Sequence, residues 1–372
     1  MKINVSTREL QDGIKKLEKV VNKKAKLPVL QNVLLKANQE GITITANNIE
    51  SMLVCNIKGE IQEQGLALIH HENFKLINKF KDNILEVNST NGDKVTIKGK
   101  RNLDILQEYS PVENEETILE NTSSQYEAFK INTKDLKDML KLKIATSDND
   151  NRPSNTGITI NNNHAYAVDG YRLIKKKINI STQQQKTLFL SNNAIDILDK
   201  ILGKGDDVLQ VNYILTDGNK LDKLIIKNNE FTLASRCYQG EFFNAEQVIP
   251  KEFNNTLTVR SKLLLESLEF AKEIEKGMKY PVILTIKDDN MQVARNAAKK
   301  NSLEDVRINS TFINEFKIAF NVQYLIDAIK TLDVDEIEMK FVNREINPLV
   351  INSANNTEDE LHLVLPVKLS KD

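Results

Sequence analysis

The sequence predicts an α+β fold made of three copies of one unit, in each of which two helices pack on antiparallel sheets. Three observations support this prediction. Segments with the same pattern start at Ile3, Ile131 and Val259, so that both spacings are 128 residues by subtraction. A second pattern recurs later in each copy, and a matching strand-like segment follows it. Chance similarity among amphipathic helices would not give equal spacing together with the same order of patterns.

The first pattern opens each copy with a short alternating strand, then a Ser or Thr suited to N-capping, then apolar residues at helical spacing. The three segments are KINVSTRELQDGIKKLEKVV from Lys2, FKINTKDLKDMLKLKIATS from Phe129 and LTVRSKLLLESLEFAKEI from Leu257.

The second pattern is a strand, a polar break and an amphipathic helix, in LALIHHENFKLINKF, TLFLSNNAIDILDKIL and KIAFNVQYLIDAIKTL. The strands that follow are ILEVNST, VLQVNYI and EIEMKFV. Each copy therefore has two strand–helix–strand halves, and the chain has six such helices. Hairpin signals at Asn91-Gly92 and Asp217-Gly218 agree with antiparallel strands.

The length of 372 residues favours two or three domains. The repeat predicts three, over residues 1–121, 126–250 and 255–372. Linkers are expected at Asn121–Gln125 and around Lys251–Asn255.

Composition narrows the class of protein. No apolar run approaches the length of a membrane span, and the N-terminus lacks an apolar signal region. Cys55 and Cys237 are isolated, which favours a reducing, cytoplasmic location. The 51 basic and 52 acidic residues nearly cancel, which argues against nucleic-acid binding unless positive charge is gathered on one surface.

Charge is segregated on the first predicted helix. On a helical wheel, Leu10, Ile14, Leu17 and Val21 form an apolar stripe. The opposite side carries Arg8, Lys15, Lys19 and Lys23, with Lys16, Lys24 and Lys26 near its margin.

The second copy repeats this arrangement, with Leu136 and Leu140 against Lys134, Lys137 and Lys141, whereas the third mixes lysines with glutamates. For any one helix a solvated face explains the lysines. Their repetition favours a surface that contacts phosphates without reading sequence.

Catalytic and metal-binding patterns are missing. The four histidines form no HExxH or related motif, and the sequence has no Walker A loop and no G-x-S-x-G elbow. The acidic clusters Asp148–Asp150 and Asp333–Glu338 could hold Mg²⁺, although solvated charge is the commoner use of such segments. We therefore expect no enzyme activity, no metal and no cofactor.

Local motifs resemble those of the bacterial beta sliding clamps, the beta subunits of DNA polymerase III. The resemblance covers the chain from its first strand almost to its last residue. It rests on KLPVLQNVLL from Lys26, ITITANNI from Ile42, VDGYRL from Val168, AFNVQYLID from Ala319 and LVLPVKL from Leu363.

The resemblance implies three like-folded domains per chain and a head-to-tail homodimer that forms a ring around duplex DNA. It also implies a clamp loader that opens the ring, and docking of the DNA polymerase III alpha subunit and other proteins through short peptides. No membrane partner is implied.

The resemblance further implies a peptide groove. Its residues would be Val168, Gly170, Tyr171, Arg172, Leu173, Phe243, Val248, Leu363, Leu365, Pro366 and Val367. Without the resemblance, Asp169-Gly170 indicates only a hairpin turn. Val168 replaces the usual Thr, Gln247 stands where an Arg is common, and Leu365 and Val367 replace methionines, so a different peptide preference is expected.

For DNA, the family's loops imply Lys24, Asn149 and Arg152, in addition to Lys15, Lys19, Lys23, Lys137 and Lys141 on the predicted helices. For the ring interface, the resemblance implies Leu103 and Ile105 on an edge strand, meeting a helix near Lys272 and Ile274 of the partner chain.

Two other functions stay open from the residues alone. One is a metal-dependent enzyme acting on a polyanion, and the other is a repeat scaffold that binds only proteins.

Overall fold

The computed structural model of the chain describes residues 1–90, 93–119, 124–148, 151–180, 186–275, 280–342, 348–355 and 359–368. The chain forms two compact units. The first consists mainly of residues 1–137 and 188–239, and the second mainly of residues 138–179 and 240–372. Every strand pair described below is antiparallel, so the predicted α+β class is confirmed.

The first unit contains two sheets. The smaller has the order β5-β1-β7-β8-β9, made of β5 (Gly59–Glu63), β1 (Lys2–Ser6), β7 (Ile84–Thr90), β8 (Lys94–Lys98) and β9 (Asn102–Leu106). The larger has the order β10-β15-β16-β17-β4-β3-β2-β6, made of β10 (Tyr126–Asn132), β15 (Val208–Leu215), β16 (Leu221–Lys227), β17 (Phe231–Arg236), β4 (Ser51–Ile57), β3 (Gly41–Asn47), β2 (Asn32–Asn38) and β6 (Gly65–His70). The strand β14 (Leu188–Ser191) also belongs to this unit.

The helices of the first unit are α1 (Thr7–Leu17), α2 (Phe74–Ile77), α3 (Glu115–Ile118) and α5 (Asn192–Ile201), with 3-10 turns η1 (Pro28–Gln31) and η2 (His71–Asn73). The helix α4 (Thr133–Leu140) begins in the first unit and ends in the second. Helix α1 packs on β3 and β4 because Leu10, Ile14 and Leu17 form its fully buried face.

The second unit also contains two sheets. Its larger sheet runs β11-β12-β13-β26-β25-β24-β18-β22, made of β11 (Gly157–Asn161), β12 (His164–Val168), β13 (Arg172–Lys177), β26 (Glu360–Val364), β25 (Leu349–Ser353), β24 (Glu336–Phe341), β18 (Asn255–Arg260) and β22 (Asn309–Ser310). The smaller runs β21-β20-β19-β23, made of β21 (Asn301–Arg307), β20 (Asn290–Asn296), β19 (Val282–Lys287) and β23 (Phe316–Phe320).

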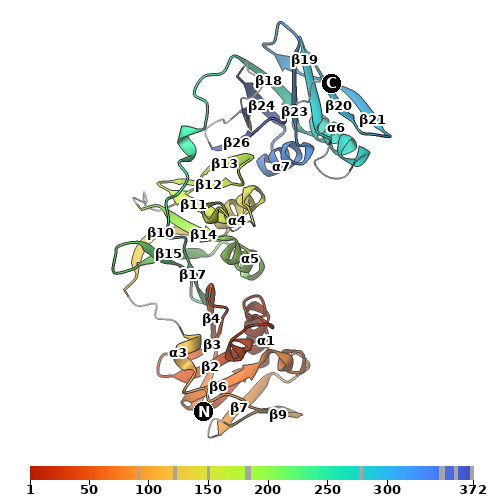
Figure 1. The fold of residues 1–372 in the computed structure, drawn as a ribbon. Helices are drawn as coiled ribbons and strands as arrows, with labels where there is room; N and C mark the ends of the chain where they lie inside the picture. The colour runs from red at the N-terminus through yellow and green to blue at the C-terminus, as the bar shows by residue number, and fades with distance from the viewer. Residues whose placement is uncertain are drawn as a thin grey trace. The chain divides into compact units, whose positions relative to one another are not determined.

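Two helices, α6 (Ser261–Ile274) and α7 (Val322–Leu332), lie side by side in the second unit (Figure 1). Helix α6 packs on β20 and β21, and α7 packs on β25 and β26. Their apolar faces join one core with Leu284, Met291, Phe320 and Phe341 from the sheets. Three 3-10 turns complete this unit: η3 (Lys141–Ala145), η4 (Pro153–Asn155) and η5 (Ala245–Gln247).

The predicted repeat pattern is present in the strand pairing. In each copy, the strand before the first helix pairs with the strand after the second helix. The three pairs are β1 with β7, β10 with β15 and β18 with β24. The hairpin expected at Asp217-Gly218 joins β15 and β16. The other expected hairpin, at Asn91-Gly92, lies outside the described residues.

Three sequence-based details are wrong. Lys19 and Lys23 were predicted on the first helix, but α1 ends at Leu17 and both lysines lie in the turns that follow it. In these turns the N–H groups of Val20 and Val21 donate to the Leu17 carbonyl at 2.8 and 3.0 Å. β-Branched valines are weak helix formers, and these two are buried outside the helix.

The second helix of the first copy is only the four-residue α2 preceded by η2, because it is flanked by the weak helix formers Asn73 and Asn78. The expected Ser and Thr caps of the first pattern also fail. Ser6 makes no capping hydrogen bond, and the Thr133 hydroxyl donates instead to the Asp207 carbonyl at 2.9 Å. Helix α3 was not predicted.

Strand pairs join successive copies of the repeat inside each unit. In the first unit β17 pairs with β4, and in the second β13 pairs with β26. The second junction contains a buried ionic cluster, in which the Glu360 carboxylate accepts from Lys176 Nζ at 2.5 Å and lies 2.7 Å from His362 Nε2. Burial opposes the charge of Glu360, but these two partners outweigh it and hold the pKa of Glu360 below its ordinary value.

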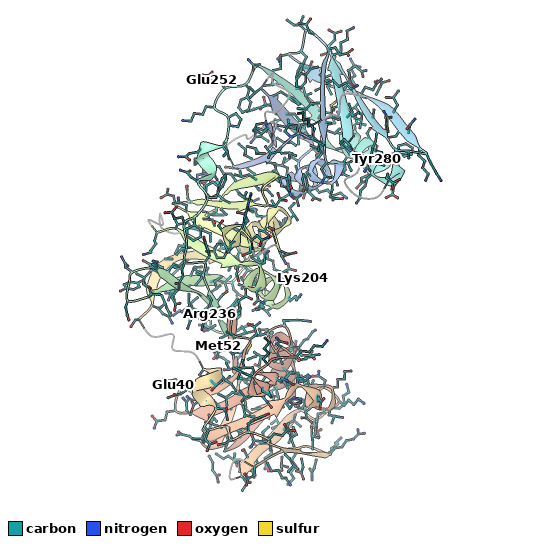
Figure 2. The ribbon with its side chains drawn as sticks, viewed as in Figure 1. Glu40, Met52, Lys204, Arg236, Glu252 and Tyr280 are labelled. Atoms are coloured by element: carbon teal, nitrogen blue, oxygen red, sulfur yellow. The ribbon has the colours of Figure 1, made fainter. Side chains whose placement is uncertain are left out.

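A fully buried arginine fixes the end of α6. Arg295 on β20 donates from Nη1 to the carbonyls of Ala271, Lys272 and Glu275, at 3.1, 3.1 and 2.7 Å, and from Nε to the Tyr280 carbonyl at 2.8 Å (Figure 2 labels Tyr280). A cation is favourable there because the last carbonyls of a helix lack partners and carry its negative end.

Among the described residues, no helix combines the length and the apolar composition that crossing a membrane requires.

Candidate functional site

The second unit contains a largely apolar cavity of about 610 Å³, which we call the Arg172 groove. It lies between the β12–β13 turn, η4, the segment around η5, and the ends of β25 and β26. Its lining residues are Arg152, Ser154, Asn155, Val168, Gly170, Tyr171, Arg172, Leu173, Phe243, Val248, Pro348, Leu363 and Leu365.

The β12–β13 turn shapes one wall of the groove. Asp169 Oδ1 accepts from the backbone N–H groups of Tyr171 and Arg172, at 2.8 and 3.0 Å. Gly170 has a φ of 95°, a conformation that favours glycine, and a Cβ there would lie 3.3 Å from Arg152 Nη1. Glycine therefore lets the turn close against Arg152.

Arg172 is held in one position by four contacts. Its Nε lies 2.9 Å from Asp169 Oδ2, its Nη1 lies 2.6 Å from Asp327 Oδ2, and its Nη2 donates to the Ile144 carbonyl. The guanidinium carbon lies 4.4 Å from the centre of the Tyr324 ring. An arginine suits this place because its planar group serves several acceptors and an aromatic face together.

Asp327 is fixed in turn, since Gln323 Nε2 donates to its Oδ1 at 2.6 Å. The two sequence motifs VDGYRL and AFNVQYLID are thus in contact through Arg172 on one side and Tyr324 and Asp327 on the other. Burial, together with the nearby Asp169 carboxylate, raises the pKa of Tyr324, so its ring stays neutral under the arginine.

The floor of the groove is apolar. Leu173 and Leu363 are paired residues of β13 and β26, both are buried, and they pack with Ala245 and Val350. Around this floor, large apolar side chains stay exposed to solvent: Tyr171 (61%), Phe243 (47%), Val248 (41%) and Leu365 (37%). Such a patch is typical of a binding surface for another apolar group.

The structure brings nine of the eleven predicted groove residues together. Pro366 and Val367 do not line the cavity, and the Val367 N–H instead donates to the Ala319 carbonyl at 2.7 Å. Sequence reasoning missed Ser154, Asn155 and Pro348 as lining residues. These residues line the groove only because the fold brings distant segments of the chain together. No local sequence pattern identifies Pro348.

A second, more polar cavity of about 480 Å³ adjoins the groove and shares Arg152, Asn155, Gly170 and Tyr171 with it. Arg152, predicted as a DNA contact, therefore lines both cavities. An extended ligand in the groove can continue into the second cavity past this arginine.

The lysines predicted to face DNA lie on exposed parts of the chain. Lys15 is on α1, while Lys19, Lys23 and Lys24 lie in the turns that follow it. Two further lysines have partners in the chain: Lys137 Nζ donates to the Gly203 carbonyl at 2.6 Å, and Lys141, on η3, lies 2.7 Å from Asp138. Asn149 lies outside the described residues.

The residues predicted for the ring interface lie at two places. Strand β9 is at the edge of its sheet, with Ile105 buried, Leu103 half-buried and Leu106 78% exposed. Lys272 is exposed and Ile274 half-buried in the last turn of α6. The edge strand β21, against which α6 packs, carries Leu303 at 64% exposure.

Within the described part of the chain, no group of three or more His, Cys, Asp or Glu residues is arranged to hold a metal ion. Burial raises the pKa of both thiols, Cys55 and Cys237, to about 12, so neither forms a thiolate nucleophile near neutral pH.

Comparison with known families matches both ends of the chain. The DNA polymerase III beta subunit N-terminal domain matches residues 1–138, and the C-terminal domain of the same subunit matches residues 246–368.

Individual relatives agree over the whole length. The beta sliding clamp of Mycoplasma capricolum is 25% identical and covers 100% of both chains, and that of Halalkalibacterium halodurans is 24% identical and covers 96% of both.

Among solved structures, the DNA polymerase sliding clamp of Bacillus subtilis has a TM-score of 0.88 at 20% identity, covering 100% of both chains. The DNA polymerase III beta subunit of Thermotoga maritima has a TM-score of 0.85 at 23% identity, covering 99% of this chain and 100% of that one. These structures show the same fold.

Proposed function

The chain belongs to the family of DNA polymerase III beta subunits, the beta sliding clamps, and on this premise we propose that two copies of it close into a ring around duplex DNA. It is a DNA sliding clamp, a processivity factor and not a catalytic enzyme. The observation that carries the proposal is the family match over residues 1–138 and 246–368. We also propose that the protein is located in the cytoplasm, where the replication machinery operates.

The three repeats, over residues 1–121, 126–250 and 255–372, are the proposed clamp domains. A ring of two chains would hold DNA topologically, so that each contact with a phosphate needs to be only weak. The exposed Lys15, Lys19, Lys23 and Lys24, together with Arg152, supply such contacts; Lys137, Lys141 and Asn149 complete the proposed DNA surface.

Edge strands support closure of the ring. Strand β9 of one chain would pair with β21 of the other, burying the exposed Leu106 and Leu303 and bringing Leu103 and Ile105 close to Lys272 and Ile274. Such a contact is heterologous and closes by rotation. Unpaired edge strands with exposed leucines are prone to aggregation, and pairing of β9 with β21 of the partner chain would prevent it.

The Arg172 groove is the proposed docking site for the alpha subunit of DNA polymerase III and for other partners. An apolar peptide side chain would pack on Leu173 and Leu363, between the exposed rings of Tyr171 and Phe243. The fixed Arg172 and the nearby Arg152 would orient the peptide backbone. Pro366 and Val367 would extend the contact beyond the cavity.

The ring is tested by loading the chain onto nicked circular DNA with the clamp loader of a relative, such as Bacillus subtilis, and then cutting the circle. We expect the protein to stay on circles and to leave linear DNA. The Leu303→Asp variant should be monomeric by sedimentation and should not be retained, whereas Lys299→Met, a surface change in the same domain, should load normally.

Equal retention on circular and linear DNA would contradict the ring. Loss of DNA mass that depends on Mg²⁺ would instead support the metal-dependent enzyme, and a chain that stays monomeric and never loads would support the protein-only scaffold.

The groove is tested separately with a labelled peptide that carries Leu and Phe. We expect the peptide to bind the wild-type chain and the exposed-lysine control Lys299→Met equally, and to lose affinity for Leu173→Ala or Leu365→Asp. Unchanged affinity in both groove variants would show that the peptide binds elsewhere.

A further inference from the structure

One wall of the Arg172 groove has another cavity on its other side. The wall is the segment of residues 242–248, from which Phe243 and Val248 line the groove. The other cavity has a volume of about 250 Å³, and its lining includes Tyr166 on the sheet and residues 242–246 of the segment. Phe243 lines both cavities, so the segment separates them. Packing alone therefore does not hold this part of the wall in place.

Regular secondary structure does not fix the wall either. Residues 237–244 form neither helix nor strand, and η5 is a 3-10 turn of three residues. The Gln247 N–H donates to the Asn244 carbonyl at 3.3 Å, so Phe243 is joined to the end of this turn. Ala245 is buried on the groove floor, which makes it one fixed point of the segment. The position of Phe243 therefore depends on what else holds η5.

A carboxylate on η5 is tied to the sheet by two polar contacts. The Tyr166 hydroxyl donates to Glu246 Oε1 at 2.7 Å, and Lys175 Nζ lies 2.7 Å from the same oxygen. Tyr166 and Lys175 are paired residues of β12 and β13, so their side chains lie on one face of the sheet. Leu173 of the groove floor precedes Lys175 by two residues and lies on the same face. We call Tyr166, Lys175 and Glu246 the Glu246 clasp.

The charges of the clasp suit a fixed contact of modest strength. Burial opposes the charge of Glu246, but the bonds from Lys175 and Tyr166 outweigh it and hold the pKa of Glu246 below its ordinary value. Burial, and then the bond to Glu246, raises the pKa of Tyr166, so its hydroxyl keeps the proton that it donates. The Glu246 side chain is 54% exposed, which limits what the ion pair contributes to stability. The clasp therefore acts mainly on the position of η5.

We propose that the Glu246 clasp positions Phe243 in the wall of the Arg172 groove, and so determines how closely the groove fits a large apolar side chain. A wall that is held in place before binding loses less conformational freedom when the peptide arrives. Without the clasp, η5 and Phe243 can move toward the cavity behind them and away from the peptide. The inference rests on the proposed peptide binding in the Arg172 groove, and it adds positioning residues that do not line that groove.

The test measures binding of three peptides to the full chain by fluorescence anisotropy. The first is fluorescein-Gly-Ser-Leu-Phe-Ser-amide, and the other two have Ala in place of Leu or of Phe. Phe243→Ala identifies which peptide side chain contacts the wall. Truncating that side chain should weaken binding to the wild-type chain at least about tenfold, and binding to Phe243→Ala clearly less.

The clasp variants should lose the same discrimination. Glu246→Ala should bind the full peptide about fivefold more weakly, but the truncated peptide, which no longer reaches Phe243, almost as well as the wild-type chain does. Tyr166→Phe removes one bond and keeps the ring, and Glu246→Gln keeps an oxygen that can accept from Tyr166. Each should therefore weaken binding of the full peptide only about twofold. In all three variants, hydrogen exchange of the amides in residues 242–248 should accelerate.

Two matched controls lie outside the clasp. Glu252→Ala removes an exposed glutamate further along the chain (Figure 2 labels Glu252), and Tyr126→Phe removes the hydroxyl of an exposed tyrosine in the first unit. Both should bind all three peptides as the wild-type chain does. Circular dichroism checks that each variant folds, and the ratio of two affinities does not depend on the fraction of chain that is folded.

Three results would overturn the inference. One is an unchanged ratio of affinities in Glu246→Ala and Tyr166→Phe, another is an equal loss for the full and truncated peptides, and the third is the same cost of truncation in Phe243→Ala as in the wild-type chain. If Leu173→Ala still weakens binding in these cases, the peptide groove stands and the clasp alone is wrong. Unchanged affinity in Leu173→Ala would contradict both, because the peptide would then bind elsewhere.

Discussion

Replacing Arg295 with methionine is expected to destabilise the second unit by about 2–4 kcal/mol. Arg295 is fully buried, and its removal leaves four carbonyls without their donor: one buried, of Ala271, and three partly buried, of Lys272, Glu275 and Tyr280. An unsatisfied buried carbonyl costs about 1–3 kcal/mol, and each partly buried one costs about 0.5 kcal/mol or more because water replaces the donor incompletely. Methionine also removes a positive charge from the interior, which is favourable and offsets part of the summed free-energy cost of the carbonyls.

The effect should begin at the end of α6. We expect hydrogen exchange of the amides in residues 261–274 to accelerate before global unfolding, and the unfolding transition of the second unit in urea to move to lower denaturant. Since Lys272 and Ile274 lie in the last turn of α6, self-association measured by sedimentation should weaken as well.

Lys287→Met is the matched control, because Lys287 is an exposed cation on β19 of the same sheet, away from the proposed interface strand. It should change the free energy of unfolding by no more than about 0.5 kcal/mol. If Arg295→Met and Lys287→Met have the same stability and the same exchange in α6, the hydrogen bonds of Arg295 do not stabilise the end of the helix.

Three further outcomes are expected. The pKa of Glu360 is lower in the folded chain than in the unfolded chain, so the ionised carboxylate stabilises the fold. This stabilisation is fully present above the unfolded pKa of about 4.3 and is lost as the pH falls through the folded pKa. Glu360→Gln should therefore flatten the acid side of a plot of the free energy of unfolding, measured in urea, against pH. Arg172→Met should weaken binding of the Leu- and Phe-bearing peptide at least about tenfold by fluorescence anisotropy, and Arg172→Lys should restore it only in part; full affinity in Arg172→Met would exclude a positioning role. Replacing the exposed lysines with Gln should make the plot of log DNA affinity against log salt concentration less steep, by about 0.9 for each phosphate that is no longer neutralised. The lysines replaced are Lys15, Lys19, Lys23 and Lys24. An unchanged slope would show that these lysines do not contact DNA.

The sequence predicted the repeat and its strands well, because side-chain alternation and helical spacing are local properties. Strands such as β7 and helices such as α7 coincide with segments chosen from the pattern alone. Helix ends were less predictable. The end of α1 at Leu17 goes with the burial of Val20 and Val21 outside the helix, which no local pattern contains.

Prediction of the site depended on family resemblance. Motifs identified Arg172 and Asp327 separately, but only the fold shows that they form an ion pair at 2.6 Å. Arg295 and Pro348 had no signal in the sequence, because their importance comes from residues in other elements that only the fold brings next to them.

The pairing of β17 with β4 and of β13 with β26 limits how such a chain can be shortened. Deleting the middle repeat would remove β10 to β17 and leave both β4 and β26 with an uncovered edge, ready to pair with the same edge of another molecule. A fragment cut at a predicted linker would meet the same difficulty. A copy of the repeat therefore cannot be removed without exposing strand edges, because strands of neighbouring copies complete one sheet.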